Sequence, residues 1–579
     1  MRTLFGIDLG TTNSCISRLN QGVPEVLTLD GSPLVPSVVS FEPEETIVGS
    51  RARNRAILHP ETTVSSVKRV IGSDHTYVIG DQRFTPAEIS SFILSHLKTQ
   101  AQEVAGEAVK NVVITVPAYF SDAQRRATQK AGELAGLKVE RIINEPTAAA
   151  LFYIHTLLSQ GPEQKERNVL VYDLGGGTFD VSILRMGELT EVLASSGNTE
   201  LGGDDFDQVL LDLCMEEIMS THGRDLRTHP PAKARLKSSA EQAKMTLSAH
   251  PYATIEESLI PNPDGKPLNL SLEISRDTFE QMIEPYLQTT QTEVKNALSE
   301  VGLSAQSIDH VLLVGGSTRI PAVIDLMENQ FGDSRMPVVD PDLSVAKGAA
   351  IQGGIITGSH VHQVLIDVTS HTLSTSALSD RWEMRLECVP IIDRNTQIPV
   401  IRSEMFYTIV TNQRQVRVDV YQGESIRPDE NTLIGSLDLA LSPAPEGSPI
   451  VIEYSYDVNG IIHVKVEQKG YSRKREVDLD SSKQDQKFLH LDLQYTEDKE
   501  VWDDFEDEDA QDDSKEVTNY ILHKARNTLE TIKNPAQRNT LQTLIAAYEQ
   551  ALLGEDEDTV DEAEENLVDY LDELDNPEG

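Results

Sequence analysis

The sequence predicts a multi-domain protein in which an α/β domain is followed by an antiparallel β domain and a short, acidic, α-helical C-terminal segment. At 579 residues the chain is too long for one hydrophobic core, because single cores stop growing near about 250–300 residues. Residues 1–355 alternate strand-like and helix-like patterns, whereas a period of two prevails from Asp367 to about Lys487. The predicted boundaries are 1–358 for the α/β domain, 359–367 for a linker, 368–490 for the β domain and 491–579 for the acidic segment.

Apolar runs that lead into glycine turns or helix caps characterise the first part of the chain. The run "VVITV" (Val112–Val116) precedes a helical pattern that begins with Ser121 as its N-cap and Gln124 in the capping-box position. "VLVYD" (Val169–Asp173) and "HVLLVGG" (His310–Gly316) are further apolar runs, and each enters a glycine turn. Strands that alternate with helices predict an α/β fold whose core is a largely parallel sheet.

The β domain is predicted from alternation and from one turn. In "QVRVDVY" the apolar Val416, Val418 and Val420 alternate with polar residues, and Asn459-Gly460 is a hairpin signal before a second alternating run. The residues between the two domains, "HVHQVLID", include an aliphatic stretch where a passive linker would be rich in glycine, serine or charge. This segment is either a docking element or the first strand of the β domain.

The C-terminal segment is acidic and helix-forming. Residues 491–579 hold 28 Asp and Glu against 6 Lys and Arg, a net charge of −22. Residues 498–513 are too acidic to pack and predict a loop or a disordered stretch. Amphipathic patterns follow at about 515–532, 536–553 and 559–574, and together they predict a small helical bundle.

Charge and cysteine content bound the partners and the compartment. The net charge of −43 would repel phosphate backbones, so nucleic acid is not an expected partner, and a solvated acidic surface accounts for the charge. Cys15, Cys214 and Cys388 are widely separated, which suits a reducing compartment and argues against structural zinc. "MRTLFGID" lacks the features of a signal peptide, and no stretch approaches the roughly 18 apolar residues of a bilayer span. We therefore expect a cytoplasmic protein with no membrane partner.

Two similar phrases predict a site for a phosphorylated ligand. "GIDLGTTNSC" (Gly6–Cys15) and "YDLGGGTFD" (Tyr172–Asp180) each run through Asp, Leu and Gly into small and hydroxyl residues, so we expect duplicated α/β halves that face each other. Backbone N–H groups at the glycines and the threonine hydroxyls suit phosphate oxygens. Asp8 and Asp173 lie where hydrated Mg²⁺ needs carboxylates, since Mg²⁺ keeps several waters. The chain contains neither a P-loop nor a Rossmann fingerprint.

Six phrases carry a family resemblance: "GIDLGTTNSC", "VPAYFSDAQRRAT", "RIINEPTAAAL", "VYDLGGGTFDVSIL", "LGGDDFD" and "LVGGSTRIP". In this order and spacing they resemble the nucleotide-binding domain of the DnaK-type heat-shock chaperones, which has the actin-like ATPase fold. The resemblance covers the first 355 residues nearly throughout. The brevity of the chain and its divergent C-terminal part look more like a specialised bacterial paralogue of the HscC kind. The resemblance implies ATP or ADP as the ligand, Mg²⁺ as a cofactor and K⁺ as a second candidate cation.

The resemblance also implies roles for individual residues. Lys68 would reach the γ-phosphate and the attacking water, and Glu145 would help to place that water and the waters on Mg²⁺. The implied catalytic residues are Asp8, Lys68, Glu145, Asp173, Thr178 and Asp180, of which Asp8 and Asp173 act on the metal through water. The implied nucleotide-binding residues are Gly10, Thr11, Thr12, Asn13, Gly175, Gly176, Gly177, Gly202, Gly203, Glu241, Lys244, Ser248, Gly315, Gly316, Ser317, Arg319 and Asp342.

The β domain resembles the family's peptide-binding sandwich more loosely. The residues implied for a hydrophobic groove are Phe406, Val416, Val418 and Ile461 along it, with Met384 and Ile409 bridging over it. In such a groove, backbone hydrogen bonds would hold an extended segment and an apolar pocket would add modest specificity. Inward aliphatic residues on alternating strands are also what a plain core requires, so both interpretations stay open. A missing glycine and an insertion of about six residues before Met384 predict a reshaped groove rim.

The favoured function is an ATP-dependent chaperone, in which ATP binding opens the peptide groove and hydrolysis closes it. Val364, Leu365 and Asp367 would dock on the ATPase domain, and Arg141 and Asn144, with Asp367, match positions that couple the family to a J-domain partner. Expected partners are unfolded or hydrophobic client peptides and a J-domain co-chaperone, with a nucleotide-exchange factor as a further candidate, and we expect a monomer. The alternatives are a weakly hydrolysing holdase or exchange-factor-like relative, a small-molecule kinase with the same actin-like core, and a filament-forming ATPase.

Overall fold

The structure is a computed structural model of the 579-residue chain. It describes residues 3–160, 165–187, 189–263, 265–337, 339–359, 365–380, 385–471, 473–478, 529, 535–551, 566–567 and 570. Val364 and Met384 lie outside the described residues, as do the predicted acidic stretch 498–513 and almost all of the patterns at 515–532 and 559–574. Helix α11 (Pro535–Ala551) coincides with the amphipathic pattern predicted at about 536–553.

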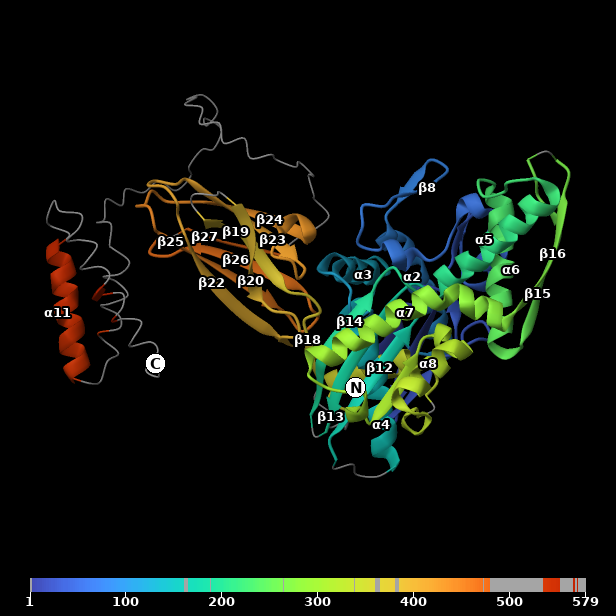
Figure 1. Cartoon of the computed structure of the whole chain (residues 1–579), viewed down its shortest axis with the longest axis horizontal. Helices are drawn as coiled ribbons and strands as arrows, with labels where there is room; N and C mark the ends of the chain where they lie inside the picture. Colours follow the sequence, from blue (N-terminus) through green and yellow to red (C-terminus); the bar gives the residue numbers. More distant parts are fainter. Residues whose placement is uncertain are drawn as a thin grey trace.

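The α/β part contains two larger sheets with helices and small hairpins around them (Figure 1). The strands of the first sheet are β1 (Phe5–Asp8), β2 (Asn13–Asn20), β3 (Val23–Val26), β4 (Val35–Pro36), β10 (Asn111–Val116) and β11 (Lys138–Asn144). The strands of the second sheet are β12 (Arg167–Leu174), β13 (Phe179–Met186), β14 (Thr190–Asn198), β17 (His310–Val314), β18 (Leu365–Val368) and β21 (Gln397–Ile398). The remaining strands are β5 (Val39–Phe41), β6 (Thr46–Val48), β7 (Thr63–Val64), β8 (Tyr77–Ile79), β9 (Gln82–Phe84), β15 (Tyr252–Ile260) and β16 (Leu268–Ser275). The helices are α1 (Ser50–Ala56), α2 (Pro86–Ala105), α3 (Asp122–Leu134), α4 (Glu145–Gln160), α5 (Gly203–His222), α6 (Pro230–Ala249), α7 (Arg276–Glu300), α8 (Pro321–Phe331) and α9 (Ser344–Ile356).

The two larger sheets share one arrangement of strands. In the first sheet β1 pairs antiparallel with β2 and parallel with β10. In the second sheet β12 pairs antiparallel with β13 and parallel with β17. The two Asp-Gly phrases of the sequence lie at the turns of the β1–β2 and β12–β13 hairpins. The repeat seen in the sequence is therefore a repeat of structure. The prediction of a largely parallel sheet is wrong, because β2 and β13 return antiparallel to β1 and β12 and make both sheets mixed.

Helices α4 and α9 pack between the two halves. A shared core includes Val113 of the first sheet and Val171 of the second, with Ala149 of α4 and Val345 of α9. The two helices cross at Gly348, where an added Cβ would lie 1.7 Å from a carbonyl oxygen of α4. Only glycine permits this approach, so the position is a requirement of packing rather than of the site.

Local sequence also explains how α3 begins. The Ser121 hydroxyl accepts a hydrogen bond from the Gln124 backbone N–H, and the Gln124 side chain accepts one from the Ser121 N–H. These two bonds satisfy donors that the first turn of a helix leaves without partners. The predicted capping box is confirmed.

The β domain consists of two four-stranded antiparallel sheets packed around one hydrophobic core. One sheet contains β19 (Leu373–Asp380), β20 (Arg385–Ile392), β23 (Gln415–Gln422) and β24 (Thr432–Ala440), and the other contains β22 (Val400–Tyr407), β25 (Pro449–Tyr456), β26 (Ile462–Gln468) and β27 (Lys474–Asp478). Val418 and Val420 of β23 are buried and the residues beside them are more exposed, which confirms the predicted alternation. The predicted turn at Asn459-Gly460 joins β25 to β26.

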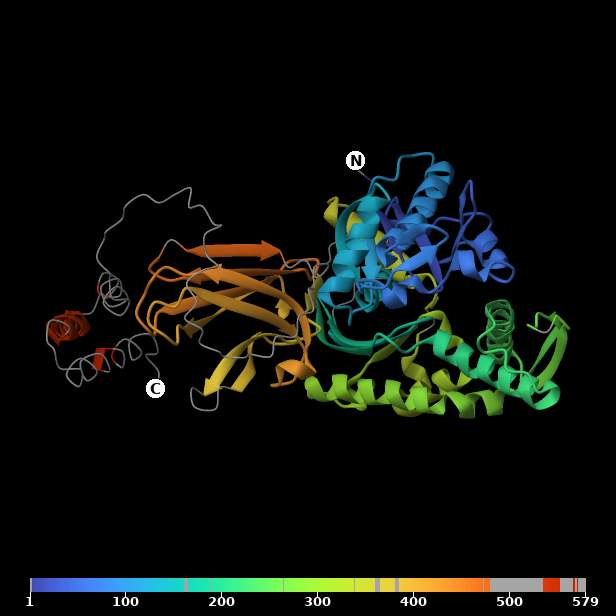
Figure 2. The same ribbon diagram turned by 90° about the horizontal axis from the view of Figure 1, so that it is seen from above.

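Strand β18 connects the two domains and belongs to the second sheet of the α/β part. Leu365 and Ile366 pair in parallel with Thr190 and Glu191 of β14. The end of the predicted linker 359–367 therefore adds a strand to a sheet and is not a free tether. Figures 1 and 2 place the β domain against the end of the α/β part where β14 and β18 lie.

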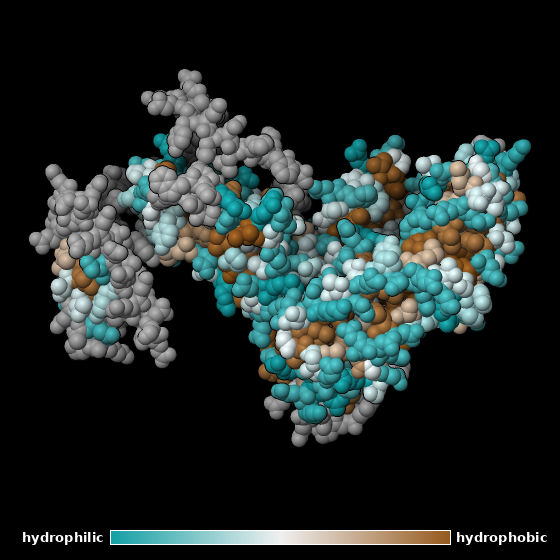
Figure 3. Space-filling view, viewed as in Figure 1, coloured by the Kyte–Doolittle hydropathy of each residue, from teal (hydrophilic) through white to brown (hydrophobic). Residues whose placement is uncertain are grey.

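The surface is mainly hydrophilic on the face shown in Figure 3, where hydrophobic side chains gather in small patches. None of the helices in the described part of the chain combines the length and the apolarity that crossing a membrane requires.

Candidate functional site

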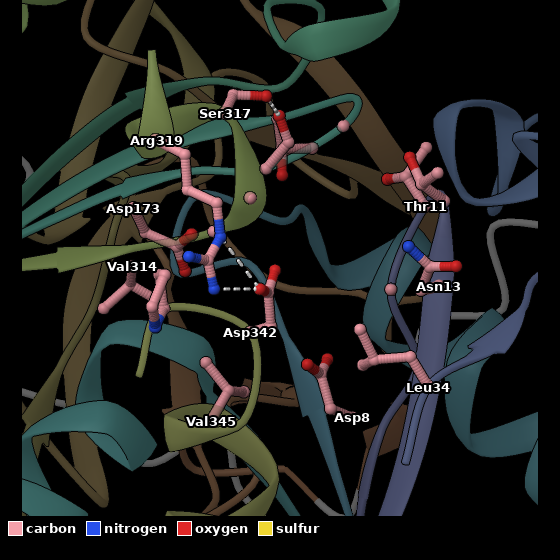
Figure 4. A pocket seen from close by; sticks show the side chains of 18 of the residues that line it. Asp8, Thr11, Asn13, Leu34, Asp173, Val314, Ser317, Arg319, Asp342 and Val345 are labelled. Atoms are coloured by element: carbon pink, nitrogen blue, oxygen red, sulfur yellow. Dashed lines mark hydrogen bonds and ion pairs between the residues drawn. The ribbon is translucent and has the colours of Figure 1, made fainter. Parts of the chain in front are cut away.

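A cavity of about 340 Å³ lies between the two halves of the α/β part, where the β1–β2 and β12–β13 hairpins face each other (Figure 4). The predicted site residues that line it are Asp8, Gly10, Thr11, Thr12, Asn13, Lys68, Glu145, Asp173, Gly175, Gly176, Thr178, Glu241, Lys244, Ser248, Gly315, Gly316, Ser317, Arg319 and Asp342. Residues that are hundreds of positions apart in the chain are thus gathered around one space.

Four predicted site residues do not line the cavity itself. They are Gly177, Gly202, Gly203 and Asp180. The Gly203 N–H donates a hydrogen bond to the carbonyl oxygen of Gly175 at 2.9 Å. An added Cβ at Gly202 would lie 2.5 Å from the backbone nitrogen of Gly177. These glycines let the start of α5 pack directly on the β12–β13 loop, so they support the loop from outside the cavity.

The loops of the β1–β2 and β12–β13 hairpins, which we call the two phosphate loops, approach closely because glycine is present at their contact. An added Cβ at Gly176 would lie 2.0 Å from Thr12 Oγ1. A larger residue would push the second loop away from the hydroxyls of the first. The same holds for Gly177, where an added Cβ would lie 2.8 Å from Thr11, so the approach explains two of the three consecutive glycines.

The apolar lining of the cavity was not predicted as part of the site. It consists of Leu34, Met245, Val314, Ile320, Pro341 and Val345. Val314 and Ile320 flank the glycines of the phrase "LVGGSTRIP", and Met245 follows Lys244 on α6. Apolar residues beside a glycine turn are usual in any buried strand, so the sequence offers no signal that sets these six apart.

An excess of buried carboxylates surrounds one lysine at the centre of the site. Lys68 Nζ lies 2.5 Å from Glu145 Oε1, and both side chains are buried. Burial, together with the charge of Glu145, raises the pKa of Asp8 to about 7. The same two causes raise the pKa of Asp180 to about 7 and shift the pKa of Asp173 upward. The centre therefore lacks positive charge, and a cation bound there would stabilise the ionised carboxylates.

The donor set fits a hydrated magnesium ion. In the described part of the chain no group of three or more His, Cys, Asp or Glu side chains is spaced to bind a metal directly. Asp173 Oδ2 is buried and has no hydrogen-bond partner, so it is free to accept from a metal-bound water. Mg²⁺ takes few protein ligands and keeps several waters, which agrees with this arrangement.

Paired charges also line the cavity. Arg319 donates to Asp342 Oδ2 from Nε at 3.1 Å and from Nη2 at 2.6 Å (Figure 4). On α6, Lys244 Nζ lies 2.8 Å from Asp207 Oδ1. Sequence reasoning missed Asp207, because it lies on α5 and only packing brings it to α6.

A salt bridge across the mouth of the cleft was also missed. Arg53 Nη2 of α1 lies 2.5 Å from Glu241 Oε2 of α6, and the two residues are 188 positions apart. The pair joins the two sides of the cleft above the cavity. Its sequence neighbourhood contains several other arginines, so no local signal singles out Arg53.

The predicted coupling residues meet at a buried polar cluster beside β18. Asp367 Oδ2 accepts hydrogen bonds from Asn144 Nδ2 at 2.9 Å and from Thr147 Oγ1 at 3.2 Å, and Arg125 Nη2 donates to Asn144 Oδ1 at 2.7 Å. Burial lowers the pKa of Arg141, whose Nε has no hydrogen-bond partner in the described part of the chain. Thr147 and Arg125 were not predicted as members of this cluster.

The β domain itself contacts α3 and β11. Asp122 Oδ1 accepts from the Ile462 N–H at 3.0 Å, and Arg126 Nη2 donates to the Ile462 carbonyl oxygen at 2.5 Å. Asn459 Oδ1 accepts from the Ile142 N–H at 3.1 Å. The β25–β26 turn and the start of β26 are therefore bound to the α/β part by hydrogen bonds between side chains and backbone groups.

The described residues that were predicted for the groove differ in burial. Phe406 and Val416 pack partly buried against the sandwich core, and Val418 is 1% exposed within it. Ile461 is buried at 6% exposure, whereas Ile409 is 44% exposed. Val418 is buried in the sandwich core, and the peptide groove stays a prediction.

Comparison with known proteins finds a family match over almost all of the chain. A family model described as "Hsp70 protein" matches residues 4–78 and 75–576. Proteins described as "Chaperone protein DnaK" from Thermotoga petrophila, Thermotoga neapolitana and Thermotoga maritima are each 45% identical to this chain over 483 residues. The matched region covers 82% of this chain and 79% of each relative.

Proposed function

The chain belongs to the Hsp70 family and is an ATP-dependent molecular chaperone of the DnaK type with ATP hydrolase activity, and on this basis we propose how its own residues perform that activity. The cavity between the two halves binds ATP or ADP with Mg²⁺, and its occupancy controls the β domain. The narrower assignment to a paralogue of the HscC kind remains a prediction from the sequence.

One observation carries the proposal for the chemistry: two Asp-Gly hairpins face each other around a cavity that also holds the Lys68–Glu145 pair. The hydroxyls and backbone N–H groups of the hairpin loops would hold the phosphates, and Asp8 and Asp173 would hold hydrated Mg²⁺. Lys68 would neutralise charge on the transferred phosphoryl group, and Glu145 would orient the attacking water. Phosphoryl transfer needs this positioning and charge neutralisation more than covalent help.

The other end of the cavity would bind adenosine. Glu241, Lys244 and Ser248 lie on one face of α6 and line the cavity, and Arg319 with Asp342 lines it on the side of the β17 turn. The polar groups of α6 would bind the nucleoside, and the arginine pair would cover it. K⁺ is a second candidate cation near the carboxylates.

Communication between the domains would depend on β18 and the cluster around Asp367. The parallel pairing of Leu365 with Thr190 supports docking of the linker on the ATPase domain. We propose that a J-domain co-chaperone binds at this cluster, through Arg141 and Asn144. Unfolded or hydrophobic peptides would be the clients, held by the β domain beneath a lid-like segment at 491–579. We also propose that the protein is a cytoplasmic monomer and that a nucleotide-exchange factor acts on it.

Single-turnover hydrolysis in the full chain, with and without a panel of hydrophobic peptides, tests the proposal. We expect ADP to form with ATP alone and its rate to rise with peptide. A rise with sugars or small carboxylic acids instead would favour the small-molecule kinase. Peptide binding with no measurable ADP formation would favour the weakly hydrolysing holdase.

A further inference from the structure

A second cavity, of about 330 Å³, adjoins the nucleotide cavity. Thr11, Thr12 and Glu241 line both spaces. The two threonine hydroxyls belong to the loop that would hold the phosphates, so the second cavity adjoins that loop as well as Glu241 of α6. Arg319 and Asp342, at the adenosine end, line only the first cavity.

One face of α6 forms a wall of both cavities. Lys233, Lys237 and Glu241 are spaced four residues apart on this helix and line the second cavity. Lys244 and Ser248 continue the same face into the first cavity. Residues three and four apart lie on one side of a helix, so polar side chains run without interruption from one space to the other.

The charged residues that line the second cavity are Arg53, Lys233, Lys237, Asp204, Asp207 and Glu241. Glu241 pairs with Arg53 at 2.5 Å and Asp207 pairs with Lys244 at 2.8 Å, whereas Asp204 forms no ion pair in the described part of the chain. Asp204 Oδ2 accepts a hydrogen bond from the Ser66 hydroxyl at 2.6 Å. Lys233 is exposed and Lys237 is half-buried, and within the described residues neither forms an ion pair.

These free ammonium groups stand out in a chain whose net charge is −43. Two neighbouring ammonium groups without an ion pair attract a small anion. Ser65, which follows β7, also lines the space and adds a hydroxyl donor. A charged, hydroxyl-lined space next to a phosphate site suits inorganic phosphate.

We propose that the second cavity is the exit site for inorganic phosphate and that Lys233 and Lys237 bind the phosphate on its way out. The inference rests on the proposed function. In hydrolysis the water oxygen bonds to the γ-phosphorus as the bond to the β,γ-bridging oxygen breaks, which yields ADP, inorganic phosphate and one proton. The phosphate then passes Thr11 and Thr12 into the second cavity, while ADP stays held at the adenosine end.

Parallel measurement of chemistry and release in the full chain tests the exit site. In a single turnover, acid quenching reports ADP formation and a fluorescent phosphate-binding protein reports free phosphate. The double variant Lys233→Ala/Lys237→Ala should form ADP at the wild-type rate and release phosphate at least about fivefold more slowly. Lys233→Arg/Lys237→Arg should restore release, because it restores charge.

The matched control removes the same charge elsewhere. Lys110 and Lys295 are exposed lysines outside both cavities, and Lys110→Ala/Lys295→Ala should change neither rate. Equilibrium binding of radiolabelled inorganic phosphate to the ADP complex is the second readout. It should weaken at least about fivefold in the Lys233→Ala/Lys237→Ala variant and not in the control.

The outcomes separate the two proposals. Unchanged phosphate release in the Lys233→Ala/Lys237→Ala variant overturns the exit site. Weaker phosphate binding together with unchanged release also overturns it, because the cavity would then take phosphate from solution only. A wild-type chain that forms no ADP overturns the proposed function instead, and in that case unchanged phosphate binding in the double variant overturns the site as well.

Discussion

Replacing Asp367 with alanine should uncouple the β domain from the ATPase domain while nucleotide binding stays intact. The Asp367 carboxylate is buried and accepts hydrogen bonds from Asn144 at 2.9 Å and from Thr147 at 3.2 Å. Both donors belong to the ATPase domain, whereas Asp367 ends the linker. Asp367 does not line the nucleotide cavity, so its loss leaves that site complete.

The expected magnitude follows from the two hydrogen bonds that cross between the elements. Hydrogen bonds to charged groups contribute about 1.5–3 kcal/mol each. Burial raises the pKa of Asp367, so its charged form is already desolvated and the lower figure applies. Two bonds then amount to about 3 kcal/mol, which shifts the docking equilibrium roughly 150-fold. Asp367→Asn keeps an oxygen that can accept both bonds but removes the charge, so each bond falls to about 0.75 kcal/mol and the docking equilibrium should shift by roughly tenfold.

Limited proteolysis with thermolysin measures docking directly, because thermolysin cleaves before Leu365 and Ile366. In the wild type, ATP should slow cleavage there and ADP should not. In Asp367→Ala the two nucleotides should give the same fast cleavage, and ATP should no longer release a bound fluorescent peptide. Affinity for ATP, measured separately, should stay within about twofold of the wild-type value.

A matched variant controls for the loss of a carboxylate. Asp438 is exposed on β24, so Asp438→Ala should retain the protection by ATP. If Asp367→Ala and Asp367→Asn both retain full protection, the cluster around Asp367 does not hold the linker and the argument from hydrogen bonds fails.

Three further predictions concern the chemistry, the ligand and pH. Lys68→Ala should bind ATP nearly normally and hydrolyse it at least about tenfold more slowly in a single turnover, about 1.4 kcal/mol of barrier, and an unchanged rate in the folded variant would contradict its role. Because we propose that Glu241 and Lys244 bind adenosine, competition binding should show a preference for ATP over GTP, which equal affinities would refute. Burial lowers the pKa of His371 from 6.5 to about 4, and its Nε2 donates to a carbonyl oxygen of the ATPase domain. The docked state then binds fewer protons than the undocked state, so docking should be strongest above about pH 6.5 and should weaken toward pH 4. ATP-induced peptide release should be weaker at about pH 5.5 than at about pH 7.5, and His371→Leu should remove that difference.

Much of the site was predictable because it is built from local phrases. The Asp8 and Asp173 turns each combine a strand end, a carboxylate and glycines within ten residues, and such a combination determines its own backbone. The capping box at Ser121 is equally local, and the structure contains it. Alternation in β23 predicts which side chains face inward, because successive residues of a strand point to opposite faces.

Contacts between distant elements were not predictable. Glu241 meets Arg53, and Asp367 meets Thr147, across 188 and 220 positions of the chain. Each partner is one of many similar residues, and only the packing of helices on sheets brings a particular pair together. Val418 shows the same limit, because an inward valine on a strand fits a groove and a core equally well.

The sequence by itself determined the class of each domain, the two phosphate loops and the resemblance that the comparisons confirmed, since all of these depend on residues that are neighbours in the chain. The tertiary structure decided how the two halves close around one cavity and where β18 pairs. It also decided that α6 presents Lys233 and Lys237 to a second space beside the phosphate loop. These features depend on the relative placement of rigid elements, which is set by the packing of hundreds of side chains together and not by any single segment.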